Sequence, residues 1–316
     1  MSPVAGQRTS AGLVLALGGG GARGLAHIGV LEVLAEHGLP VRGVVGTSIG
    51  AEIGAFLAAG MSVAEMTSVA TSLDWKLVLR LFFPDLHAGG LVSGERILSW
   101  LADKLGAARV EDLSLPFAAV ATDLERGEEV VLDRGPLVEA VRASVSLPGT
   151  LAPFRLGGRL LVDGGVVNQV PADVARRLHG GPVLAVAVHA ASQAWPGPAP
   201  KAGPWRERLA QLLGERWMRR APHLREFLSA EAASAEGGDE SEWSPLLVLQ
   251  RSALVSQEML VRLRLATSPP DVLLVPDVSD VGMLEFYRAG EAIEAGRAAA
   301  RQRIDEIAAL VSPAGS

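Results

Sequence analysis

The fold is decided by the stretch GLVLALGGGGARG (12–24) and by VRGVVGTSIGA (41–51), which follows it closely. In each, an apolar run predicts a buried strand that ends in a glycine-built turn. The first turn is Gly18–Gly24 and the second is Gly46–Gly50. The second turn can expose the hydroxyl of Ser48, and the first can offer backbone N–H groups to an anion. Together they indicate a nucleophile beside an oxyanion hole, the core of an acyl-transfer enzyme.

Strands and helices alternate along this part of the chain. We expect strands at Leu13–Leu17 and Val41–Val45, and helices at Ala22–His37 and Ala51–Ala59. This β-α-β-α order predicts an α/β fold with a mainly parallel sheet covered by helices. The later expected elements are strands at Phe117–Thr122, Glu128–Leu132, Arg159–Val162, Pro182–Val188 and Asp271–Pro276, and a closing helix at Arg288–Leu310.

Composition narrows the function classes. The 316 residues are 49% hydrophobic, enough for a sizeable core, and the net charge of −6 argues against a nucleic-acid partner. There is no cysteine, which excludes disulfides, thiolate metal sites and thiol catalysis. Residues 1–12 lack the pattern of a signal peptide, and no apolar run has the length of a membrane span, so we expect a cytoplasmic protein.

The chain divides by composition. We expect a flexible N-terminus at 1–11, a catalytic core at 12–191, an insertion at 192–245 and a C-terminal part of the same domain at 246–311. Within the insertion, 205–217 predicts a helix with an apolar face and arginines off that face. The apolar residues are Trp205, Leu209, Leu212, Leu213 and Trp217. Such a helix suits peripheral contact with a membrane, or it packs over the core as a lid on the active-site mouth.

The glycine loop has two interpretations. Gly19, Gly21 and Gly24 satisfy the dinucleotide pattern G-x-G-x-x-G, but the second strand ends at 45–48 without the acidic residue that would hold a ribose. We therefore favour an oxyanion hole. Its candidate residues are Gly18, Gly19, Gly20 and Gly21. Arg23 then orients the loop or attracts an anionic headgroup, unless it is an ordinary surface arginine.

Two kinds of general base are open. Asp163, in an Asp-Gly-Gly turn after a short strand, can accept the Ser48 proton, although an ordinary turn aspartate has the same pattern. The order Ser48, Asp163 and then His189 or His179 matches a hydrolase triad, but those enzymes have more strands before the serine turn. His27 and His37 suit structural roles on the first expected helix.

Three motifs in order resemble the patatin-like phospholipase family: Gly19–Gly24, Gly46–Gly50 and Asp163–Gly165. Weaker agreement continues through Ala143–Gly149. The resemblance implies a three-layer α/β/α sandwich and a Ser–Asp dyad without histidine, with Ser48 as nucleophile and Asp163 as base. The residues that would support the motifs are Arg23, Gly24, Gly46, Gly50, Gly164 and Gly165.

The resemblance also implies the reaction. A phospholipid or another fatty-acyl ester would be hydrolysed through an acyl-serine intermediate, without a metal or an organic cofactor. Two alternatives stay open at this point, a Ser-His-Asp esterase and a catalytically weak, lipid-binding regulatory protein.

Overall fold

A computed structural model describes residues 12–74, 94–188 and 245–311 of the chain. The strands are β1 (Leu13–Leu17), β2 (Val41–Thr47), β3 (Phe117–Asp123), β4 (Glu128–Leu132), β5 (Phe154–Leu156), β6 (Arg159–Asp163), β7 (Val183–Val186) and β8 (Val272–Leu274). The helices are α1 (Ala26–Glu36), α2 (Ile49–Ala58), α3 (Val63–Thr71), α5 (Glu95–Leu105), α6 (Leu137–Ser144), α7 (Ala172–His179), α10 (Pro245–Thr267), α11 (Ala289–Gln302) and α12 (Ile304–Val311).

The eight strands form one sheet in the order β5-β6-β3-β2-β1-β7-β8, with β4 paired to β3. Five neighbouring strands of this sheet are parallel to one another, as the β-α-β-α pattern predicts. In their order across the sheet they are β3, β2, β1, β7 and β8. The strands β4, β5 and β6 pair in the antiparallel sense and extend the sheet at one edge. The carboxyl ends of the five parallel strands therefore lie along the same end of the sheet. Ligands bind at this end in open α/β sheets.

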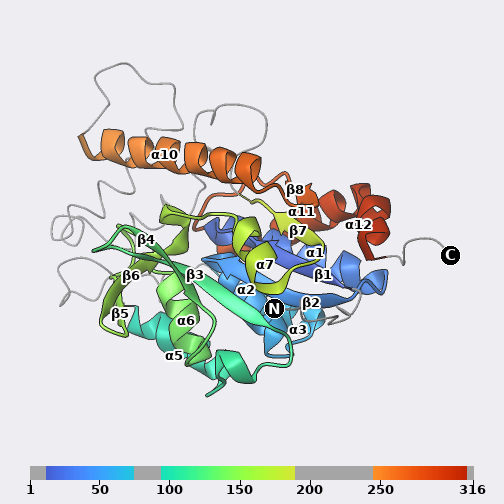
Figure 1. The fold of residues 1–316 in the computed structure, drawn as a ribbon, viewed down its shortest axis with the longest axis horizontal. Helices are drawn as coiled ribbons and strands as arrows, with labels where there is room; N and C mark the ends of the chain where they lie inside the picture. The colour runs from blue at the N-terminus through green and yellow to red at the C-terminus, as the bar shows by residue number, and fades with distance from the viewer. Residues whose placement is uncertain (1–11, 75–93, 189–244, 312–316) are drawn as a thin grey trace, which may run out of the picture.

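Helices cover both faces of the sheet, which confirms the three-layer α/β/α sandwich (Figure 1). Successive residues of β1 point to opposite faces. Leu13, Leu15 and Leu17 belong to the larger apolar cluster, with residues of α1, α2 and α11. Val14 and Ala16 belong to the second cluster, with residues of α7 and α10. Because β1 is buried on both faces, its sequence is an unbroken apolar run.

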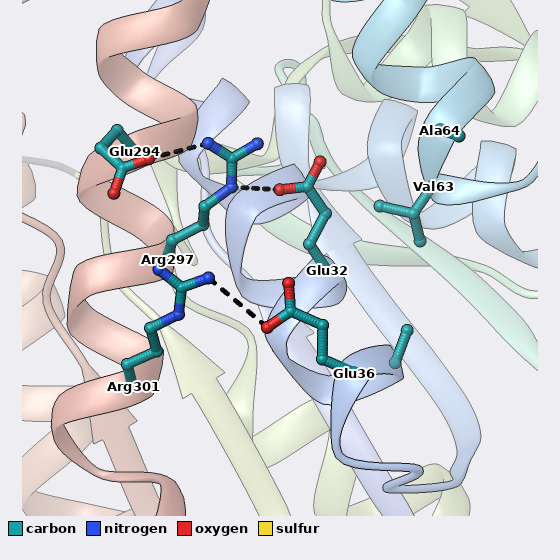
Figure 2. Close-up of a pocket in the computed structure, with 8 residues that line it drawn as sticks. Glu32, Glu36, Val63, Ala64, Glu294, Arg297 and Arg301 are labelled. Atoms are coloured by element: carbon teal, nitrogen blue, oxygen red, sulfur yellow. Dashed lines mark hydrogen bonds and ion pairs between the residues drawn. The ribbon is translucent and has the colours of Figure 1, made fainter.

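The C-terminal helix α11 is fastened to α1 at close range. A Cβ at Gly29 would lie 1.9 Å from the Ile293 carbonyl oxygen, so the helices cross where glycine leaves room. Ion pairs join the two helices beside this crossing, from Arg297 to Glu32 and from Arg301 to Glu36 (Figure 2). The groove between these charged side chains is lined by no residue of the glycine turns or of Asp163–Gly165.

Two expected helices differ from the structure. The helix expected from Ala22 starts as a 3-10 turn, Gly21–Leu25, and the Ala22 N–H at its start donates to the Met283 carbonyl. The closing helix is two helices, α11 and α12. The helix is interrupted at Arg303, which has non-helical dihedrals. The guanidinium group of Arg303 donates a hydrogen bond to the Leu273 carbonyl.

Several expectations fall outside the described residues: the N-terminus 1–11, the insertion as far as residue 244 with its helix at 205–217, and His189. Among the residues that are described, no helix is both long and apolar enough to cross a bilayer.

Candidate active site

Ser48 stands at a sharp turn between β2, which ends at Thr47, and α2, which begins at Ile49. Its dihedrals are φ 55° and ψ −126°, and among the described residues it is the only non-glycine residue with a positive φ. Such a backbone conformation costs about 1–3 kcal/mol and persists where the surroundings enforce it. A Cβ at Gly46 or Gly50 would lie 2.3 Å or 2.1 Å from backbone oxygens, so the turn closes only with glycine on both sides.

Strand β3 brings Asp163 beside Ser48. In the ladder register, Val120 of β3 pairs with Thr47, the last residue of β2. The next residue, Ala121, pairs with Asp163, the last residue of β6. The two strands thus end at adjacent positions along β3, although they are far apart in sequence. As a result, the Ser48 hydroxyl donates a hydrogen bond of 2.5 Å to Oδ2 of Asp163.

The Asp163 carboxylate is buried, with 3% of the residue exposed. Its other oxygen, Oδ1, accepts from the Gly165 N–H at 2.7 Å. Burial raises its pKa to about 6, against the opposing effect of the hydrogen bonds from Ser48 and Gly165. A carboxylate with this pKa is a stronger base than a solvated aspartate and is still ionised at neutral pH.

One turn at the end of α6 contacts both residues. The Ser48 N–H donates to the Ser144 hydroxyl at 2.9 Å, and that hydroxyl donates to the Val120 carbonyl at 2.6 Å. Two residues on, the Ser146 carbonyl accepts from the Asp163 N–H at 2.9 Å. These buried serines lie outside the three sequence motifs. The weak family agreement over 143–149 was the signal that pointed to them.

The glycine loop lies against Ser48, since a Cβ at Gly19 would be 3.1 Å from the Ser48 Cβ. Two of its amides are engaged: Gly18 N–H donates to the Val186 carbonyl and Gly19 N–H to the Gln169 carbonyl. Within the described part of the chain, no acceptor is assigned to the N–H of Gly20 or of Gly21. The part of the loop left to bind an anion is therefore Gly20–Gly21.

His27 supports this loop from below. Its Nε2 lies 2.7 Å from the Gly18 carbonyl oxygen, and because a carbonyl only accepts, Nε2 carries the proton and donates. The ring is fully buried, and burial lowers its pKa to about 4. His27 is therefore neutral at neutral pH and fixes the orientation of the Gly18 peptide group. This agrees with the structural role expected for it.

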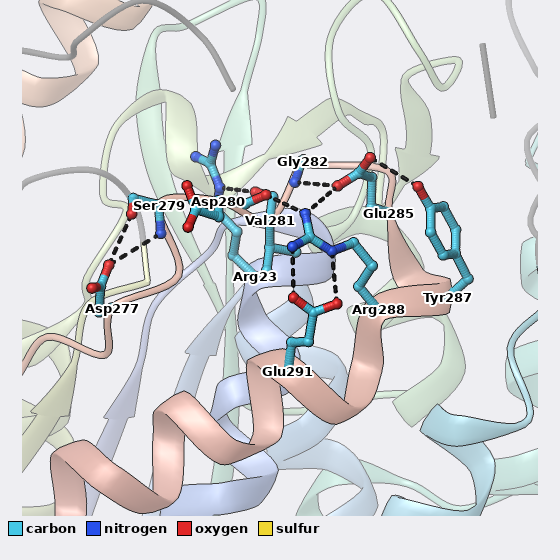
Figure 3. A network of polar contacts seen from close by, with 10 residues as sticks. All are labelled: Arg23, Asp277, Ser279, Asp280, Val281, Gly282, Glu285, Tyr287, Arg288 and Glu291. Carbon is cyan, nitrogen blue, oxygen red and sulfur yellow. Dashed lines mark hydrogen bonds and ion pairs between the residues drawn. The ribbon is translucent and has the colours of Figure 1, made fainter. Parts of the chain in front are cut away.

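The segment between β8 and α11 holds the other end of the loop. Arg23 Nε donates to the Val281 carbonyl at 2.7 Å, and Ala22 N–H donates to the Met283 carbonyl at 2.8 Å. Figure 3 shows hydrogen bonds and ion pairs among polar side chains of this segment and of the first turn of α11. Those side chains are Asp277, Ser279, Glu285, Tyr287, Arg288 and Glu291. Of the roles considered for Arg23, orienting the loop matches this contact.

Helix α10 reaches the same place from the other face of the sheet. Gln257 Nε2 donates at 2.7 Å both to the Gly165 carbonyl and to Oε1 of Gln169. The Gln169 amide in turn lies against Gly19, whose Cβ would be 3.0 Å from its Nε2. The Asp-Gly-Gly turn, the glycine loop and α10 are thus linked through two glutamines that lie outside the three sequence motifs.

Of the two histidines considered for a triad, only His179 lies among the described residues. His179 lies at the end of α7 against Gly43, five residues before Ser48 along β2. Five residues of strand span about 16 Å, too far for direct proton transfer. Within the described ranges, no three histidine, aspartate or glutamate side chains are grouped to hold a metal ion.

Comparison with known proteins adds the family to this geometry. The family model of patatin-like phospholipases matches residues 15–176, from β1 through most of α7. The chain belongs to the patatin-like phospholipase family. An uncharacterized NTE family protein of Mycobacterium bovis is 34% identical over 93% of this chain and 91% of its own length.

Other relatives share only the core of this patatin-like chain. The patatin-like phospholipase domain-containing protein 7 of Rattus norvegicus is 39% identical over 57% of the chain and 14% of its own length. The neuropathy target esterase sws of Drosophila melanogaster is 36% identical over 55% and 13%. The family match identifies the chain as a lipid ester hydrolase. The matched family region contains Ser48, Ser144 and Asp163 but ends before Gln257 and the segment that holds Arg23.

Proposed function

We propose that this patatin-like protein is a serine lipid acyl hydrolase of the phospholipase A or lysophospholipase type. Ser48 is its nucleophile, Asp163 its base, and Gly20–Gly21 its oxyanion hole. The observation that carries the proposal is the 2.5 Å hydrogen bond from the Ser48 hydroxyl to a buried carboxylate whose pKa is raised to about 6.

In the acylation half-reaction, Ser48 Oγ bonds to the ester carbonyl carbon while its proton passes to Asp163 Oδ2. The carbonyl oxygen becomes an oxyanion that accepts hydrogen bonds from the amides of Gly20 and Gly21, and single donors of this kind contribute about 2.7–4 kcal/mol in other enzymes. When the tetrahedral intermediate collapses, the bond to the leaving alkoxide breaks. Asp163 protonates that alkoxide and is ionised again.

Deacylation repeats the chemistry with water. Asp163 takes a proton from water as the oxygen of that water attacks the acyl-serine. The second tetrahedral intermediate releases the fatty acid, and the proton on Asp163 returns to Ser48 Oγ. One group therefore serves as base and acid in both halves, and its pKa just below neutral suits both tasks.

The test combines active-site labelling with turnover. The full chain and its Ser48→Ala and Asp163→Asn variants would be treated with a fluorophosphonate probe and assayed on phosphatidylcholine. We expect each variant to lose at least about a thousandfold in kcat/KM, because removing one member of a catalytic unit costs nearly as much rate as removing the whole unit. Ser48→Ala should also lose all labelling. Ser72→Ala, which removes an exposed serine hydroxyl from the surface, is the matched control and should retain both.

The competing assignments predict other results. A Ser-His-Asp esterase would lose activity in His179→Ala or His189→Ala, whereas the dyad keeps most of it in both. A lipid-binding regulatory protein would bind phosphatidylcholine with no labelling and no turnover. Near-normal turnover by Asp163→Asn would refute the role of that carboxylate.

A further inference from the structure

One side of helix α10 contacts the core. Val261 is buried in the apolar cluster beneath α10, and Gln257 is bonded to the Gly165 carbonyl next to Asp163. Arg264 pairs with Asp173 of α7. These three residues, spaced at three to four positions, define the inner side of the helix. The Asp163–Gly165 turn and this side of α10 are therefore in direct contact.

The outer side of α10 is exposed and carries no charge. With 3.6 residues per turn, the described residues on this side share a single arc of the helix. They are Val248, Leu249, Ser252, Ala253, Ser256, Met259, Leu260, Leu263, Ala266 and Thr267, and all of them are exposed. The five large apolar members are between 40% and 66% exposed. The charged residues Arg251, Glu258 and Arg262 lie on the flank instead.

This concentration is unusual for a water-facing surface. Eleven large apolar side chains are exposed among the described residues, and six of them are on α10. A seventh, Val166, follows the Asp163–Gly165 turn that Gln257 contacts. A helix facing water normally carries charged residues on its outer side. An exposed apolar patch beside an active site marks a binding surface.

We propose that the outer side of α10 is the surface through which this protein docks onto a lipid surface. The choice of lipid as the partner rests on the proposed function, because an enzyme that hydrolyses acyl esters must reach molecules that reside in bilayers or micelles. The arc supplies aliphatic side chains of the kind that insert at the acyl boundary and brings no charge that would have to be desolvated.

A second copy of the chain fits this surface less well. A stripe of helix twenty residues long and about 10 Å wide covers roughly 300 Å². Stable protein interfaces bury roughly 800 Å² on each partner. A bilayer needs no such complementary area, because each inserted side chain leaves water independently. Because Arg262 is paired with Glu258 on the flank, the attraction should come from apolar insertion and depend little on salt.

The test measures binding apart from catalysis. The Ser48→Ala chain would be sedimented with phosphatidylcholine vesicles at 0.05 M and 0.5 M salt, so that no lipid is consumed. Leu249→Ser/Leu263→Ser would be introduced into the same background. The matched control is Leu178→Ser/Val275→Ser, which removes two exposed apolar side chains from elsewhere on the molecule. Circular dichroism and thermal unfolding would establish that both double variants are folded.

We expect the α10 variant to bind vesicles at least tenfold more weakly than the parent chain, and the control to bind like the parent, at both salt concentrations. Equal binding by the α10 variant and its parent would overturn the proposal. So would the absence of binding by the parent, or a parent dimer in light scattering that dissociates only in the α10 variant. Loss of binding in the α10 variant alone would sustain this docking surface even if fluorophosphonate labelling and turnover failed.

Discussion

The dyad and the glycine loop meet at one point of the sheet edge, but different parts of the chain hold them. Ser48 and Asp163 are positioned by β3 and by the Ser144–Ser146 turn, all inside the region that the family shares. The loop is held by backbone carbonyls of Gln169, Val186, Val281 and Met283. Three of these four residues lie beyond residue 176, where the shared region ends, and two of them lie just before α11.

This difference separates two aspects of the site. The dyad side sets which atoms react, and its geometry is built into the sheet register. The loop side sets how well the developing charge is stabilised, and its geometry depends on a segment some 260 residues further along the chain. Damage to the first side should abolish the chemistry, whereas damage to the second should weaken it.

The largest effect short of the dyad itself is expected at Ser144. Ser144→Ala removes the acceptor for the Ser48 N–H and the hydroxyl that donates to the Val120 carbonyl. The strained turn then loses its side-chain anchor, and a misplacement of about 1 Å costs roughly a hundredfold in rate. We expect kcat to fall by about that factor while KM changes little.

Ser146→Ala is the matched control for that experiment. Ser146 is equally buried in the same turn, but it reaches Asp163 through its carbonyl, which the substitution keeps. Both variants should lose stability, because each removes a buried hydroxyl with two hydrogen-bond partners. Equal losses of kcat in the two variants would mean that the turn supports the fold and does not position Ser48.

The next effect is the response of the dyad side to pH. Below about pH 6, Asp163 is protonated in the folded enzyme and cannot accept the Ser48 proton. We therefore expect kcat/KM on a soluble ester to fall about tenfold per pH unit below pH 6. That profile reports the pKa of the free enzyme. An acid limb near pH 4 would contradict a desolvated base.

The same group links pH to stability. The pKa of Asp163 is about 6 in the folded state and near 3.9 when unfolded, so the folded state binds this proton more tightly. The contribution of Asp163 to the free energy of unfolding is thus fully present below pH 4, and it falls by about 3 kcal/mol in total as pH rises to well above 6. In urea titrations, Asp163→Asn should be more stable than the wild type at pH 8, and this advantage should vanish near pH 4.

His27, on the loop side, acts in the opposite direction. Its pKa is lowered from 6.5 to about 4 in the folded state, so the unfolded state binds this proton more tightly. Stability attributable to His27 is present above pH 6.5 and is lost as pH falls toward 4. The two contributions offset each other in the wild type. The difference between the wild type and Asp163→Asn is therefore the informative quantity.

The sequence was sufficient for the parts of the site that are made by neighbours in the chain. The glycine turn around Ser48 could be predicted because a side chain at Gly46 or Gly50 would collide with the backbone. Such collisions restrict the residue type at these positions to glycine. The alternation of strands and helices gave the sheet for a similar reason, since burial on both faces demands apolar residues.

The hydrogen bonds that hold the glycine loop could not be predicted from the sequence in the same way. Gly19, Ala22, Arg23 and His27 all bond to backbone carbonyls. Every residue type supplies a carbonyl, so an acceptor of this kind leaves no mark on the sequence. The nearness of Asp163 to Ser48 likewise comes from where two strands end along β3, which depends on tertiary register. Gln257 was missed because α10 itself was not predicted.

The smallest effect is expected where the loop side is anchored, at Arg23. Arg23→Met keeps the aliphatic stem but removes the Nε donor to the Val281 carbonyl, while Ala22 and His27 still hold the loop. The loop amides would be less well preorganised for the oxyanion, which forms only along the reaction path, so the loss should be in kcat. We expect kcat to fall about fivefold with little change in KM.

Arg42→Met is the control, because Arg42 also donates Nε to a backbone carbonyl, that of Gly12, but at the opposite end of β2 from Ser48. Its kcat should stay near the wild-type value although its stability falls. A fall in kcat as large as that of Ser144→Ala would show that the C-terminal segment positions the nucleophile as well, and the two sides of the site would then act as one unit.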